Sequence, residues 1–253
     1  GKLVREASID LKENDVMVFV SDGALYASAG QSLNLNWKWE DIAKHLKINV
    51  RDSMSALDIK NNLLGVCDQM YLFEPGDDTT VCVLKAVKPK KVKLFTGPPS
   101  HKEDDAKVVH ELMNNADIRI VSGGTTSQIV ARELGVEVKS STEIYDKEVP
   151  PIAYIQGIDL VTEGVLTLSK TIDRLKSLSK SLDSDIFKAK DGASQMAKLL
   201  YSASHIKLLV GRSLNIANAE SSFQRDLELR LHVVGELEKI LVKLGKIVTV
   251  EYY

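Results

Sequence analysis

Three apolar runs, of which the second is the weakest, predict strands in the first third of the chain. They cover residues 16–20, 70–73 and 79–87. Between the first two runs, apolar residues recur at the spacing of an amphipathic helix over residues 39–46 and again over residues 56–63. The pattern therefore predicts strands with helical material inserted between the first and the second.

From residue 92 onward, short apolar strands alternate with amphipathic helices. Such alternation is typical of a mostly parallel sheet with helices on both faces. Two of the helices end at a glycine, as helices often do. The expected strands are 92–95, 118–121, 136–138, 206–210 and 247–250, and the expected helices are 104–115, 126–134 and 227–244.

A change of composition separates these two patterns. Pro89 lies among Lys88, Lys90 and Lys91, and this short stretch reads as a solvated linker. We therefore predict two α/β domains, residues 1–88 and residues 89–253. The second is expected to be doubly wound and Rossmann-like.

Composition narrows the class of protein. The chain has 253 residues, of which 44% are hydrophobic and 27% charged, and its net charge is −2. These values predict a soluble globular protein that binds no nucleic acid. The sequence holds no signal-like start and no apolar run long enough to span a membrane, and Cys67 and Cys82 lack metal-binding or redox spacing. We expect a cytoplasmic protein with two ordinary thiols.

Acidic residues stand at the ends of two predicted strands. Asp22 follows the first strand in Ser21-Asp22-Gly23, and Asp77 and Asp78 precede the strand that begins at residue 79. Mg²⁺ and Mn²⁺ prefer carboxylate and water oxygens, and strand-end aspartates suit that preference. Taken singly, each motif is more often an ordinary turn, because Asp and Gly are common turn residues.

Taken in order, the blocks 14–23 and 77–81 resemble the sporulation stage II protein E branch of the type-2C-like metal-dependent protein phosphatases. The resemblance covers roughly residues 3–87. It implies a partial α/β sandwich with Asp22 and Asp77 as the metal ligands. Gly23 and Asp78 are the second-ranked candidates for this role. It also implies a centre of two Mn²⁺ or Mg²⁺ ions that hydrolyses phosphoserine or phosphothreonine in a phosphoprotein substrate through an activated water.

The sequence departs from this family in one respect. Complete members carry a further Asp-Gly metal motif well before the Ser-Asp-Gly block, and this chain does not contain it. Asp191-Gly192 lies far downstream, in a helix-like stretch, and cannot replace that motif. We therefore expect the chain to lack the amino-terminal half of the catalytic domain and to be inactive alone.

A glycine-rich turn stands out in the second domain. Gly123, Gly124, Thr125 and Thr126 connect a predicted strand to a helix. Backbone N–H groups at such a helix start bind anions, but a tight turn with a Ser or Thr cap fits the same residues. Glu163 is placed to orient a ligand hydroxyl or a metal, or to serve as a helix N-terminal charge. Residues 96–99, 159–164 and 211–215 are expected to converge on this edge.

The second domain is also similar to a C-terminal extension of some clostridial-type members of the same phosphatase branch. The Gly-Gly-Thr-Thr turn, Thr162-Glu163-Gly164 and the terminal Tyr252-Tyr253 carry the likeness. It implies a regulatory or ligand-sensing role, with a small anionic ligand as the expected partner. The alternative to a phosphatase is therefore a binding module with an inactive phosphatase-like domain. The oligomeric state stays open.

Overall fold

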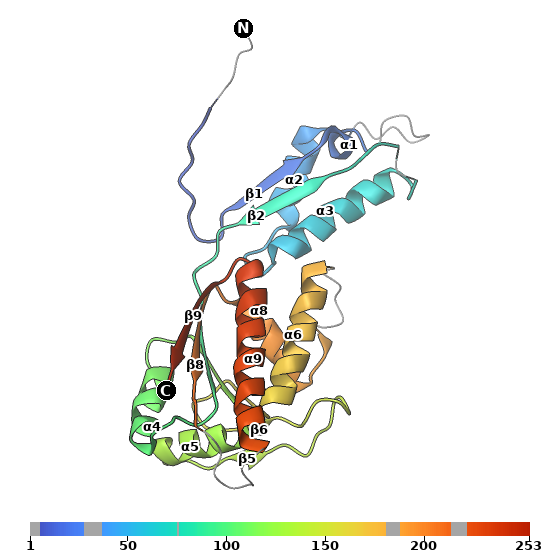
Figure 1. Ribbon diagram of the computed structural model, residues 1–253. Coiled ribbons are helices and arrows are strands. Elements are labelled where there is room, and N and C mark those ends of the chain that lie inside the picture. The colour runs from blue at the N-terminus through green and yellow to red at the C-terminus, as the bar shows by residue number, and fades with distance from the viewer. Residues whose placement is uncertain (1–5, 28–36, 75, 181–187, 214–221) are drawn as a thin grey trace. The chain divides into compact units, whose positions relative to one another are not determined.

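A computed structural model describes residues 6–27, 37–74, 76–180, 188–213 and 222–253 (Figure 1). The chain divides into two compact units, Gly1–Lys88 and Pro89–Tyr253. We call these the first and the second unit. The division falls at the proline between the lysines of the linker-like stretch.

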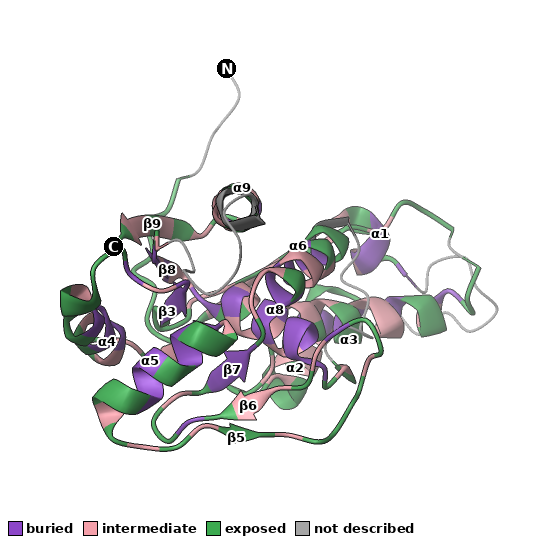
Figure 2. Ribbon diagram, turned by 60° about the horizontal axis from the view of Figure 1, so that its bottom comes forward, coloured by how far each residue is buried: buried purple, intermediate pink, exposed green. Residues whose placement is uncertain are grey.

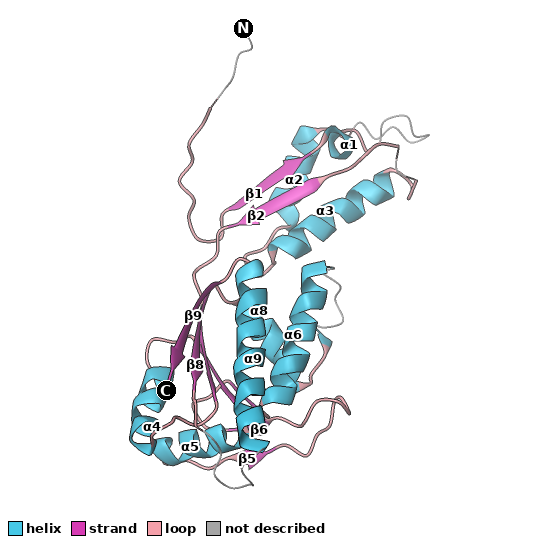
Figure 3. Ribbon diagram, in the orientation of Figure 1, coloured by secondary structure: helices cyan, strands magenta, loops and turns pink. Residues whose placement is uncertain are grey.

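The first unit combines a pair of antiparallel strands with helices (Figure 3). Strand β1 pairs with β2 in a register that sets Val20 opposite Val81. Helix α3 packs against β2. The elements are β1 (Val16–Val20), α1 (Asp22–Leu25), α2 (Trp39–Asn49), α3 (Ala56–Met70) and β2 (Val81–Lys85).

Helix α3 shows why the predicted strand at 70–73 is wrong. A capping box starts the helix, in which the Ser55 Oγ accepts from the Asp58 N–H at 3.1 Å and the Asp58 carboxylate accepts from the Ser55 N–H. The buried face of the helix extends as far as Cys67, and the helix itself ends at Met70. Met70 therefore belongs to the helix and not to a strand. Leu72 and Phe73 follow with positive φ angles of 55° and 64°. A run of four apolar residues cannot by itself distinguish a helix end from a strand.

The second unit is built on a mostly parallel sheet, and the general α/β class is confirmed. Its strand order is β5-β6-β7-β4-β3-β8-β9. The strands from β7 to β9 are parallel, whereas β5 and β6 pair antiparallel at one edge. The bounds are β3 (Lys91–Thr96), β4 (Ile118–Ser122), β5 (Lys139–Ser140), β6 (Ala153–Tyr154), β7 (Leu160–Thr162), β8 (His205–Val210) and β9 (Ile247–Tyr252). The strand expected at 136–138 is not observed at those residues. The short edge strand β5 begins one residue after that range.

Helices cover both faces of this sheet (Figure 2). One face packs on α4 and α5, and the other on α6, α8 and α9, because each face carries its own apolar cluster. The bounds are η1 (Lys102–Asp104), α4 (Asp105–Met113), α5 (Gly124–Leu134), α6 (Val165–Lys180), α8 (Gly192–Ser202) and α9 (Ser222–Lys243). The doubly wound arrangement predicted for this unit is therefore observed.

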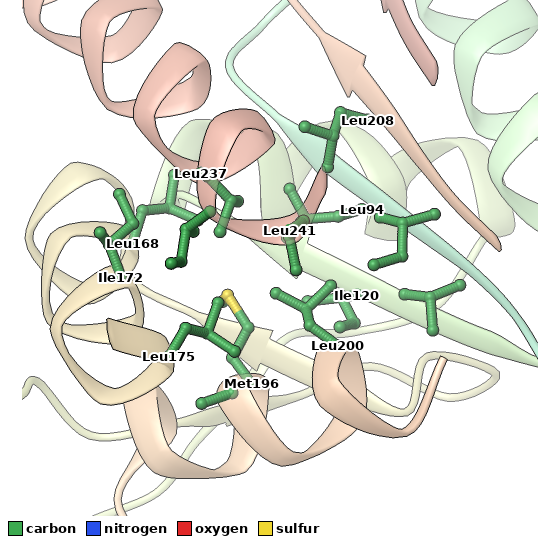
Figure 4. Packing of buried hydrophobic residues seen from close by; sticks show 14 of the residues in the cluster. Leu94, Ile120, Leu168, Ile172, Leu175, Met196, Leu200, Leu208, Leu237 and Leu241 are labelled. Atoms are coloured by element: carbon green, nitrogen blue, oxygen red, sulfur yellow. The ribbon is translucent and has the colours of Figure 1, made fainter. Parts of the chain in front are cut away.

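The larger apolar cluster joins three helices to the centre of the sheet (Figure 4). Leucines of α9 meet leucines of α6 and the Met196 and Leu200 side chains of α8, beside Leu94 and Leu208 of the central strands. Leu237 and Leu241 of α9 are fully buried there. The apolar stripe of α9 thus serves the core of its own unit.

The opposite face carries four charged side chains in contact. Glu111 Oε1 lies 2.6 Å from Lys93 Nζ and 2.8 Å from Lys207 Nζ. Lys207 Nζ also lies 2.6 Å from a Glu251 oxygen. Hydrogen bonds from Lys207 and then Lys93 lower the pKa of Glu111, against the opposing effect of burial. Lys93 can be buried in the sheet because its ammonium group has hydrogen-bond and ion-pair partners on Glu111.

We expect this cluster to make stability depend on pH. The folded pKa of Glu111 is depressed, so its contribution is fully present above the unfolded value of about 4.3 and is lost as the pH falls through the folded pKa. The Glu111→Gln variant should therefore be less stable than wild type above that value and approach it in acid. Urea unfolding measured by circular dichroism between about pH 3 and pH 6 tests this. A constant difference across that range would contradict it, and Glu103→Gln, in exposed η1, is the control.

Candidate metal and ligand sites

The structure brings the two acidic motifs of the first unit together. Because Val20 is paired with Val81, the residues that leave β1 lie beside those that enter β2. The Ser21 N–H donates to the Thr80 carbonyl at 3.0 Å, and the Thr80 N–H donates to Ser21 Oγ at 2.9 Å. Ser21 Oγ in turn donates to the Asp78 carbonyl at 3.2 Å. Ser21 is thus the joint between the motifs, a role the sequence pattern did not indicate.

Both predicted metal ligands are exposed at this junction. Asp22 begins α1, and its Oδ1 accepts from the Gly23 N–H at 3.1 Å. Asp77 Oδ1 accepts from the Asp78 N–H at 2.8 Å. Each carboxylate therefore keeps lone pairs for a hard cation, and the donor type fits Mg²⁺ or Mn²⁺. In the described ranges no group of three or more His, Cys, Asp or Glu side chains is gathered, so these residues would supply only part of a centre.

Gly23 and Asp78 serve the backbone of the junction. The Gly23 carbonyl accepts a buried hydrogen bond from the Tyr71 hydroxyl at 2.8 Å. A Cβ on Gly23 would lie 2.5 Å from the Asp78 carbonyl oxygen, so only glycine allows this approach. Asp78 contributes that same carbonyl to Ser21. Both residues support the turn that presents Asp22 and Asp77.

In the second unit, the segments that follow three strands meet at the carboxyl edge of the sheet. The Gly97 N–H after β3 donates to Thr126 Oγ1 at 2.9 Å. The Gly123 N–H after β4 donates to the Thr162 carbonyl at 2.9 Å. Ser122 Oγ donates to the Glu163 carbonyl after β7 at 2.8 Å. Parallel strands place their carboxyl ends at one edge, which explains the convergence.

The helix that follows the glycine-rich turn does not have the Ser or Thr cap that was expected. Helix α5 starts at Gly124 with Gly123 as its N-cap, at φ 120°, and no side chain caps it. The Thr126 hydroxyl instead accepts from Gly97, and Ser127 Oγ donates to the Gly123 carbonyl at 2.8 Å. Thr125 is exposed. Gly123, which adopts a positive φ that favours glycine, therefore stands at the N-cap without a side-chain cap, and the helix begins two residues earlier than predicted.

A cavity of about 330 Å³ lies between α5, β7 and the 138–153 segment. Among the described residues that line it, Glu163 is the only charged one. A Cβ on Gly124 would lie 4.0 Å from Glu163 Oε1, so this carboxylate stands beside the start of α5. The lining residues are Gly124, Ser127, Gln128, Val138, Ser140, Ser141, Pro150, Pro151, Ile152, Ala153, Val161, Thr162 and Glu163.

Two ion pairs join the segment that forms one wall of this cavity to helix α6. Lys170 pairs with Glu148, and Arg174 Nη2 lies 3.0 Å from an Asp146 oxygen. Pro150 and Pro151 follow two residues after Glu148 and line the cavity. The sequence pattern did not indicate this wall, because residues 141–152 contain no periodic apolar pattern.

A partly buried cation lies at the loops that follow β3 and β8, where the strand order reverses. Arg230 of α9 donates to the Gly211 carbonyl at 3.2 Å, and its Nη1 would lie 2.5 Å from a Cβ on Gly97. Burial lowers the pKa of its guanidinium, against the opposing charge of Asp226. Arg212, in the segment expected to converge on this edge, stacks on the Tyr252 ring at 4.2 Å. Arg230 gave no sequence signal, because it lies inside an amphipathic helix.

Comparisons with known proteins give no further identification. None of the helices in the described parts of the chain is both long and apolar enough to cross a membrane. A scan against protein-family models, a search of curated proteins and a search of solved structures find no match to this chain.

Proposed function

We propose that the first unit is the carboxyl-terminal half of a metal-dependent protein serine/threonine phosphatase. The observation that supports this most is the junction at Ser21, because it sets the Ser-Asp-Gly motif against the Asp-Asp-Thr motif. The antiparallel pairing of β1 with β2 places the two motifs side by side, which the proposed metal centre requires. The proposal takes the unit as part of an α/β sandwich.

In this proposal Asp22 and Asp77 hold Mn²⁺ or Mg²⁺ together with ligands from outside the described residues. Bound metal supplies an activated water and neutralises phosphate charge. The residues of this chain fix the geometry. Ser21 holds the two backbones together, and Tyr71 secures the Gly23 carbonyl below Asp22.

The outer face of the strand pair supports the same proposal. Phe19 and Leu84 are 50% and 52% exposed, and Cys82 beside them is exposed too. Phe19 and Cys82 are opposite each other in the register. A two-stranded sheet with an open apolar face is marginal in water, and a second sheet laid on it would bury these side chains.

Two substitutions test the phosphatase proposal in the intact protein. Asp22→Asn and Asp77→Asn keep the side-chain size and remove a charged ligand, so each should lower Mn²⁺-dependent phosphopeptide hydrolysis by about 100-fold or more. Asp78→Asn is the matched control, because that residue contributes its backbone carbonyl, and it should stay near wild type. Unchanged hydrolysis in both Asp22→Asn and Asp77→Asn would reject the site.

The cavity beside Glu163 favours a second candidate function, a ligand-binding module in the second unit. A largely apolar cavity of about 330 Å³ with a few convergent polar groups is the size of a small-molecule site. This candidate is independent of the metal site, so it stands even if the aspartate variants keep full activity.

A further inference from the structure

The residues that line the Glu163 cavity indicate which class of ligand it binds. This inference rests on the second candidate function. One wall is apolar and consists of Val138, Pro150, Pro151, Ile152 and Ala153. The lining also includes Ser127, Thr162 and Glu163. A ligand that fills the cavity must therefore have both an apolar part and polar atoms.

The polar side of the cavity is rich in hydrogen-bond acceptors. The Ser127 hydroxyl proton is used by the Gly123 carbonyl, and that of Thr162 by the Glu163 carbonyl at 2.9 Å. Both oxygens keep lone pairs, and the Glu163 carboxylate can only accept. Among these three groups none has a proton left to donate, although Gln128, Ser140 and Ser141 also line the cavity and can donate. The negative charge of Glu163 therefore decides which ligand suits this side.

The charge of Glu163 is not paired within the described residues. No Lys, Arg or His of the described ranges lies within ion-pair distance, and its recorded hydrogen bond is a long one, 3.4 Å from the Gly164 N–H to Oε2. The cavity lining adds no other charge. The net field at this wall is therefore negative.

The same carboxylate also disfavours an anionic ligand. Backbone N–H groups at the start of α5 would attract phosphate, but Glu163 Oε1 already lies beside Gly124. A phosphate bound there would meet a like charge at close range. The charge of Glu163 thus opposes the attraction of the helix start for an anion.

We propose that the Glu163 cavity binds a small primary amine, with the ammonium group on the Glu163 carboxylate and the apolar body against the proline wall. Three N–H donors of an ammonium match the acceptors of Glu163, Ser127 and Thr162. The ion pairs of Arg174 and Lys170 with the 141–150 segment keep the apolar wall in place. The ligand is recognised by charge at one end and by shape at the other.

Calorimetric titration of the full chain with matched probes tests this proposal. Pentylamine and pentan-1-ol share an apolar body and differ in the ammonium group, and inorganic phosphate is the anionic probe. Pentylamine should bind at least about ten-fold more tightly than pentan-1-ol, because a hydrogen bond to a charged group is replaced by a neutral one. Phosphate should not bind.

Variants assign the effect to one carboxylate. Glu163→Gln should weaken pentylamine about ten-fold or more, to the level of pentan-1-ol, while Glu163→Asp should retain part of the preference. Glu103→Gln, an exposed glutamate of η1 outside the cavity, should bind like wild type. Thermal unfolding of each variant confirms that it is folded.

The outcomes separate this inference from the function on which it rests. Equal binding of amine and alcohol, tighter binding of phosphate, or an unaffected Glu163→Gln variant would overturn the ammonium assignment and leave a ligand-binding module of another kind. If none of the three probes binds, the amine proposal is rejected and the second candidate function loses the observation that favours it. Neither result bears on the aspartates of the first unit.

Discussion

Replacing Gly211 by alanine is expected to destabilise the second unit by about 3–5 kcal/mol. A Cβ at this position would lie 2.1 Å from the Pro98 carbonyl oxygen and 2.2 Å from the Gly97 carbonyl oxygen. Both atoms belong to the backbone, so no side-chain rotation relieves the clash. The loops after β3 and β8 would have to separate at the point where the strand order reverses.

That separation also endangers hydrogen bonds that tie the two loops. The Gly211 N–H donates to the Thr96 carbonyl at 2.9 Å, and the Ser213 N–H donates to Pro98 at 3.0 Å. Chemical denaturation compares Gly211→Ala with Gly235→Ala, which lies in α9 with no atom within 4 Å of its added Cβ. The control should gain about 0.5–1 kcal/mol. Equal effects of the two substitutions would show that the contact is not tight.

Gly23→Ala is expected to cost the first unit about 2–4 kcal/mol and to remove Mn²⁺-dependent activity with it. The added Cβ would lie 2.5 Å from the Asp78 carbonyl and 2.9 Å from Thr79 Oγ1. Relief requires the two motifs to move apart, which breaks the contact of Ser21 with Asp78. A separation of about 1 Å at a catalytic centre lowers the rate by about 100-fold.

Gly65→Ala is the matched control for this variant. Gly65 lies within α3, and nothing lies within 4 Å of an added Cβ, so alanine should stabilise the helix by about 0.5–1 kcal/mol. Urea unfolding gives the stability, and phosphopeptide hydrolysis by the intact protein gives the activity. A Gly23→Ala protein that unfolds at the wild-type midpoint would contradict the close approach. If that protein is folded and fully active, the junction does not position the metal ligands.

Much of the second unit could be predicted because its elements are long or strongly periodic. The strand at 206–210 and the helix at 227–244 are observed as β8 and α9, with bounds that differ by a few residues. Burial on both sides makes a central strand such as β8 a continuous apolar run, which is easy to recognise. The short edge strand β5 lacks that pressure, and its predicted position was wrong.

The candidate sites could be predicted only where their residues are close together in the sequence. Asp22, Asp77 and the glycine-rich turn follow strand ends and could be located from the sequence. Arg230 and the proline wall reach their sites across the fold from segments with no pattern of their own. The ion pairs of Glu111 depend likewise on which strands are neighbours, and strand order is not encoded in local periodicity.

The sheet order also determines when this unit can fold. Strand β3 has β4 and β8 as neighbours, and β8 is separated from it by more than a hundred residues of chain. Closing so long a loop is entropically unfavourable until the central contacts form, so folding should be slow for a domain of this size. During synthesis the nascent chain would carry β3, β4 and β7 with one side of β3 unpaired until β8 emerges from the ribosome. A chain cut after α6 would keep this unpaired strand edge and would be expected to aggregate.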